Sequence, residues 1–159
     1  MKKIFIGLLM MLVFVLFNSG CFAADWGLKV SKVAQAKHYL LWKVVCTSNG
    51  SALSATDLVA LMEPSLKSEV QGSTLMVLKV SPGTGSVIPD TTIDITLADA
   101  QGTTIFTHAG YSKDAETTGI NLGEDYGAYP TVYDKFYLTL SDIGTAADQV
   151  TLYFEAWVE

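Results

Sequence analysis

The chain has 159 residues and a formal net charge of −6, because 10 Lys stand against 16 Asp and Glu and the sequence contains no Arg. Charged residues make up 16% of the chain, below the roughly 25% typical of soluble domains, whereas hydrophobic residues reach 50%. An acidic chain without Arg lacks the groups that read guanine and bind phosphates, which argues against a nucleic-acid partner. Two cysteines are too few for a disulfide scaffold, and the apolar content excludes disorder.

The first 23 residues have the order of a secretory signal peptide. A positive Met1-Lys2-Lys3 precedes the uncharged run Ile4–Phe17, and small residues follow it. The run is shorter than the roughly 20 residues that a membrane span needs. Cleavage after Ala23 is favoured, because Cys21 and Ala23 are then the small residues at the two recognition positions.

Two alternatives stay open for this segment: lipidation of Cys21 and an uncleaved anchor. The sequence predicts a secreted, periplasmic or surface protein of a bacterium, with no membrane contact after cleavage unless Cys21 is lipidated. The chain without residues 1–23 has 8 Lys and 16 acids, hence a charge of −8, and Cys46 is its one remaining cysteine.

Beyond the signal peptide, apolar residues alternate with polar ones in several segments, which predicts strands. Residues 24–36 lack a strong pattern and form either an N-terminal arm or a first strand. The predicted strands cover residues 37–48, 74–80, 91–99, 103–110, 135–142 and 149–158.

One helix is predicted near residues 54–63. Ser54 or Thr56 can cap it, and Leu58, Leu61 and Met62 follow at helical spacing before Pro64 ends or kinks it. Several strands joined by short turns, with one helix, predict a mainly β fold. We expect an antiparallel β-sandwich or jelly-roll-like single domain over residues 37–159.

No pattern of catalytic residues is present, so the sequence predicts no enzyme and no cofactor. His38 and His108 are the only imidazoles, and Cys46 lies on an apolar strand face. Exposed acids such as Asp94 and Asp134 could form a hydrolase pair, but the sequence does not place them relative to one another. Asn121, Glu124 and Asp125 are candidate Ca²⁺ ligands, although turn chemistry explains the same residues.

The aromatic residues indicate a binding or assembly surface. Tyr126, Tyr129 and Tyr133 lie in a poorly patterned stretch, and Tyr153 and Trp157 line the second face of the last strand. Aromatic side chains are enriched at protein interfaces and also stack on sugars. These five residues are therefore the predicted interface.

Nearly the whole of residues 37–159 resembles small structural proteins of tailed phages and prophages. The resemblance rests on "YLLWKVVCTSNGSALSATDLVALM", "LMVLKVSPGTGSVIP", "IDITLADAQG" and "FYLTLSDIGTAADQVTLYFEAWVE". It implies a non-enzymatic, β-rich virion component. The signal peptide departs from that family, because virion proteins assemble in the cytoplasm.

Together these features predict an exported structural protein that forms a homo-oligomer or filament, or that assembles with other structural proteins. The alternative is an extracellular carbohydrate- or surface-binding module, with or without Ca²⁺.

Overall fold

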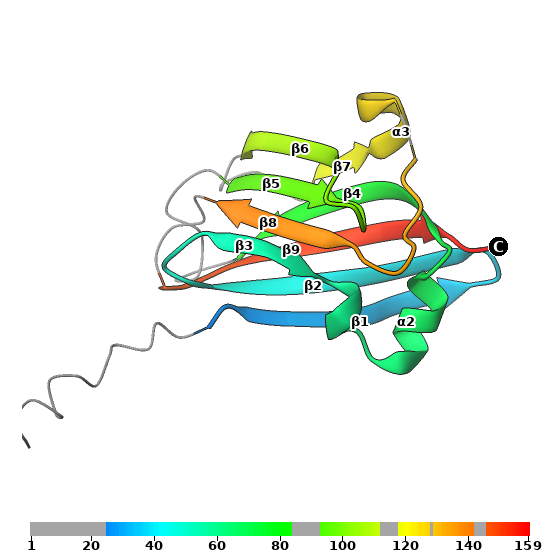
Figure 1. The fold of residues 1–159 in the computed structure, drawn as a ribbon, viewed down its shortest axis with the longest axis horizontal. Helices are drawn as coiled ribbons and strands as arrows, with labels where there is room; N and C mark the ends of the chain where they lie inside the picture. Colours follow the sequence, from blue (N-terminus) through cyan, green and yellow to red (C-terminus); the bar gives the residue numbers. More distant parts are fainter. Residues whose placement is uncertain (1–24, 84–92, 112–117, 128, 142–145) are drawn as a thin grey trace, which may run out of the picture.

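The computed structural model describes residues 25–83, 93–111, 118–127, 129–141 and 146–159 (Figure 1). The predicted signal peptide and Cys21 lie outside the described residues. Among the helices that the structure describes, none has the length and apolar content that a membrane crossing requires.

Nine strands form two antiparallel sheets. The first sheet contains, in spatial order, β1 (Gly27–Ala36), β2 (Tyr39–Asn49), β9 (Ala146–Trp157), β4 (Thr74–Pro82) and β7 (Thr118–Asn121). The second contains β3 (Leu53–Asp57), β8 (Tyr137–Ser141), β5 (Ile93–Ala98) and β6 (Thr104–Tyr111). The two sheets form two layers in Figure 1, which confirms the predicted β-sandwich.

The strand pairing is that of a jelly roll. Counted from β2, the first of eight strands pairs with the last (β2–β9), the second with the seventh (β3–β8), the third with the sixth (β4–β7), and the fourth with the fifth (β5–β6). This nested pairing is the double Greek key of jelly-roll domains. The strand β1 lies at the edge of the first sheet. Residues 24–36, predicted as either an N-terminal arm or a first strand, therefore consist mostly of a strand.

The core lies between the sheets and follows the alternation of β2 and β9. In β2, Leu40, Trp42, Val44 and Cys46 are fully buried, as their alternation predicts. The Trp42 ring stacks on Phe154 of β9 at 4.2 Å between centroids. The indole nitrogen of Trp42 is buried with no hydrogen-bond partner among the described residues. This unpaired donor costs about 1–3 kcal/mol, which the apolar packing of the ring offsets.

The predicted helix at residues 54–63 is wrong in position. Residues 53–57 form β3, a single 3₁₀ turn η1 follows at Val59–Leu61, and the helix α2 begins at Pro64 and ends at Val70. Proline suits the first helical turn, because its fixed φ is helical and the missing N–H needs no partner there. Pairing with β8 keeps residues 53–57 extended, which overrides the local helical spacing.

Asp57 holds the start of η1 to the segment before β8. Its carboxylate accepts the backbone N–H of Val59 at 3.0 Å and that of Phe136 at 3.3 Å. We expect Asp57→Ala to lower the free energy of unfolding by about 1–3 kcal/mol, because two partly buried N–H groups lose their acceptor. Chemical denaturation followed by circular dichroism measures this loss. Glu63→Ala, at an exposed side chain, is the control, and equal losses in both variants would contradict this role.

The buried thiol of Cys46 gives a second prediction. Burial raises the pKa of Cys46 to about 12, so the thiol stays protonated and covered at about pH 8. We expect no labelling of Cys46 by a thiol reagent in the native protein and rapid labelling after unfolding in guanidinium. Peptide mapping by mass spectrometry identifies the labelled site. Fast labelling of the native protein would show that β2 is not held as described.

Candidate interaction surface

An exposed aromatic patch lies on the outer face of the first sheet, at the end where β9 finishes. It consists of His38, Tyr39 and Trp157. Tyr39 pairs with Trp157 across β2 and β9, and the alternation that buries Leu40 and Ala156 turns both outward. Trp157 is 52% exposed and Tyr39 is 37% exposed.

His38 completes the aromatic patch from the turn between β1 and β2. Its ring stacks almost parallel on the Trp157 indole, with centroids 5.2 Å apart and an angle of 11°. Its Nδ1 lies 3.2 Å from the backbone carbonyl of Val158. These contacts hold the Trp157 side chain in place while leaving half of its surface open to solvent. An aromatic surface held in place in this way loses little entropy on binding a partner.

Charged side chains border the aromatic patch along β9 and β4. Lys79 and Glu155 form an ion pair on this face, and the hydrogen bond to Glu155 raises the pKa of Lys79. Partial burial and the neighbouring Glu155 carboxylate raise the pKa of Tyr39 above its ordinary value. The Tyr39 hydroxyl therefore stays protonated, and uncharged, well above neutral pH.

The predicted interface residues fall into two groups. Tyr153 and Trp157 share the outer face of β9, and Tyr153 is partly buried in a row between Lys43 of β2 and Lys79 of β4. Tyr39 is not among the five predicted interface residues, although it pairs with Trp157. The cross-strand register of β2 and β9, which one sequence does not reveal, is the missing signal.

The other predicted tyrosines lie on a separate part of the chain. Tyr129 and Tyr133 are exposed, at 43% and 68%, and they flank the segment 130–132, which is hydrogen-bonded beside the start of β4. Thr74 of β4 pairs with Trp157 on one side and with Thr131 on the other. The segment 130–132 is therefore separated from the end of β9 by β4 alone. The side chain of Tyr126 lies outside the described residues.

The candidate Ca²⁺ ligands lie at the start of, and within, a short helix that the sequence did not predict. The helix α3 spans Leu122–Tyr126, and the Asn121 side-chain oxygen accepts the N–H groups of Gly123 (3.2 Å) and Glu124 (3.3 Å). Asn121 is therefore an N-cap, and Gly127 ends the helix with φ of +77°. This Asn and Gly pair is the sequence signal that could have revealed α3.

The described residues do not bring the candidate Ca²⁺ ligands together into a metal site. The Glu124 side chain is exposed, and that of Asp125 lies outside the described residues. Within the described ranges, no group of three or more His, Cys, Asp and Glu side chains is arranged to hold a metal ion.

Comparison of the chain with protein-family models, curated proteins and solved structures found no match. The function proposed below therefore rests on the residues and their arrangement.

Tyr129 depends on Gly123 for its position. A Cβ atom at Gly123 would lie 2.0 Å from Cζ of the Tyr129 ring, so we expect Gly123→Ala to displace the ring and to destabilise the fold by about 1–3 kcal/mol. The double variant Gly123→Ala/Tyr129→Ala removes this clash and should recover part of the loss in thermal denaturation. Gly119→Ala is the control, because its Cβ meets Val77 at an ordinary 3.4 Å. Failure of the double variant to recover stability would contradict the contact.

Proposed function

We propose that this chain is an exported, non-enzymatic structural protein that self-associates through the aromatic patch. The observation that carries the proposal is the cross-strand pair of Tyr39 and Trp157, which is exposed on the outer face of the first sheet. Exposed aromatic residues of this kind are enriched at interface centres. The jelly-roll topology is compatible with a virion-like building block, although one fold serves many functions.

We expect two copies to pack symmetrically, with this face of one copy against the same face of the other. In a two-fold dimer the same patch contributes from both sides. Trp157 is 52% exposed, so about 130 Å² of it is open to solvent if its total is near 250 Å², and covering that area is worth about 3 kcal/mol. Lys79 and Glu155 lie beside the aromatic patch, where the opposite charges of a second copy can pair at the rim.

The oligomeric state of the purified protein tests this proposal. We expect multimers by light scattering and sedimentation velocity, and a shift to monomers in Tyr39→Ala/Trp157→Ala with an unchanged circular dichroism spectrum. Val33→Ser is the control, because Val33 is a similarly exposed apolar residue on β1, at 46%. A wild-type protein that stays monomeric at high concentration would overturn the proposal, as would multimers that persist in the double variant.

An extracellular carbohydrate-binding module is the second candidate. A specific observation favours it: a cleft at the opposite end of β2 from the aromatic patch is lined by an indole ring, by neutral polar groups and by one carboxylate, that of Asp25. Self-association at one end and ligand binding at the other are compatible in one molecule.

A further inference from the structure

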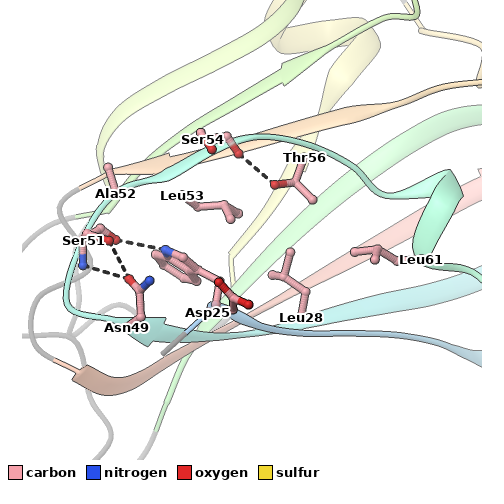
Figure 2. A pocket seen from close by; sticks show the side chains of 10 residues that line it. Asp25, Leu28, Asn49, Ser51, Ala52, Leu53, Ser54, Thr56 and Leu61 are labelled. Atoms are coloured by element: carbon pink, nitrogen blue, oxygen red, sulfur yellow. Dashed lines mark hydrogen bonds between the residues drawn. The ribbon is translucent and has the colours of Figure 1, made fainter. Parts of the chain in front are cut away.

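A cleft of about 510 Å³ opens where the edge strands of the two sheets face each other (Figure 2). The first sheet is one strand wider than the second, and β1 is its edge. The cleft lies between the start of β1, the turn after β2, and β3. Its volume falls within the roughly 300–1,000 Å³ of small-molecule sites.

An indole ring and aliphatic side chains form the apolar part of the cleft. Trp26 lines the cleft together with Leu28 and Leu53. The indole N–H donates to the backbone carbonyl of Ser51 at 3.1 Å. This hydrogen bond and packing against the core fix the orientation of the ring, and Trp26 stays partly exposed in the cleft.

Polar groups with unused hydrogen-bonding capacity line the same cleft. The side-chain oxygen of Asn49 accepts the backbone N–H (3.0 Å) and the hydroxyl (2.7 Å) of Ser51. The Asn49 amide is thereby oriented, and its NH₂ group donates to none of the described residues. The Asp25 carboxylate and the Ser54 hydroxyl also line the cleft. A ligand therefore meets the Asn49 NH₂ as a donor, the Asp25 carboxylate as an acceptor, and the Ser54 hydroxyl as either.

The features of the cleft favour a small polar ligand over a peptide strand. Pairing of an added strand with β3 needs free backbone carbonyls along its edge. Within β3 the carbonyl of Ser54 already accepts the hydroxyl of Thr56 at 2.8 Å, and in the turn before β3 the carbonyl of Ser51 accepts the Trp26 indole N–H. A register shift between Leu53 and Thr56 further interrupts this edge.

The charge of the cleft narrows the class of ligand. None of the lining residues is basic, and Asp25 supplies the one negative charge, so an anionic ligand is disfavoured. An uncharged sugar presents an apolar C–H face for an aromatic ring and hydroxyls for a carboxylate and an amide. We propose that this cleft binds one neutral pyranose unit of a glycan, packed on Trp26 and hydrogen-bonded to Asp25 and Asn49.

This inference rests on the second candidate function and is independent of self-association. NMR titration with methyl glycosides of glucose, galactose, mannose and N-acetylglucosamine tests it. A single sugar of this kind should bind with a Kd of about 1 mM, so titration to about 10 mM approaches saturation. We expect saturable shifts of the Trp26 indole N–H and of the Asn49 side-chain amide for at least one glycoside.

Variants separate the cleft from the aromatic patch. Asp25→Asn changes an exposed side chain and should weaken binding roughly tenfold, because a neutral amide oxygen replaces the charged acceptor. Trp157→Ala should leave the affinity unchanged. The proposal is overturned if no glycoside gives saturable shifts, if the shifts avoid Trp26 and Asn49, or if Asp25→Asn binds as well as the wild type. None of these outcomes bears on the oligomeric state, so failure here is distinguishable from failure of self-association.

Discussion

The structure depends on the pairing of β2 with β9, which joins the first and last strands of the eight-strand jelly roll. Trp42 and Phe154 are partners in this register and stack in the centre of the core, and Phe136 meets Phe154 edge-on at 5.8 Å. Each inner pair of the nested topology lies within the loop that this pairing closes. The entropy of closing so long a loop must be offset by the burial of these aromatic rings.

The same register determines the outer surface. Side chains alternate strictly along a strand, so a slip of β9 by one residue would expose Phe154 and bury Trp157. The aromatic patch is therefore a consequence of the core packing, because Tyr39 and Trp157 are the direct neighbours of buried Leu40 and Ala156. The ion pair of Lys79 and Glu155 adds little stability at this partly exposed site. Its contribution lies in the charges that it places beside the aromatic rings.

The two ends of β2 carry different chemistry. At its first residue, aromatic rings stand on an open sheet face, which suits a large, flat partner. At its last residue, Asn49 begins the turn beside the cleft, where an indole and polar groups suit a small ligand. The second arrangement exists because β1 extends the first sheet, so that its inward side chains meet a turn and the edge strand β3. A protein with both features could assemble on one face while another stays open to a glycan.

Sequence alone was enough to predict the sandwich, the faces of β2 and β9 and the outward position of Trp157, because a period of two in hydrophobicity directly reflects burial on one side of a sheet. It did not predict β3 or the later start of the helix at Pro64, because pairing with β8 keeps residues 53–57 extended against their local propensity. It also missed α3, although the cap residues Asn121 and Gly127 are a local signal for that helix. Only the tertiary structure decided that Tyr39 pairs with Trp157 and that Trp26 and Asn49 line one cleft. The physical reason is that strand order and register come from long-range packing, and one sequence records the pattern of each strand without its partner.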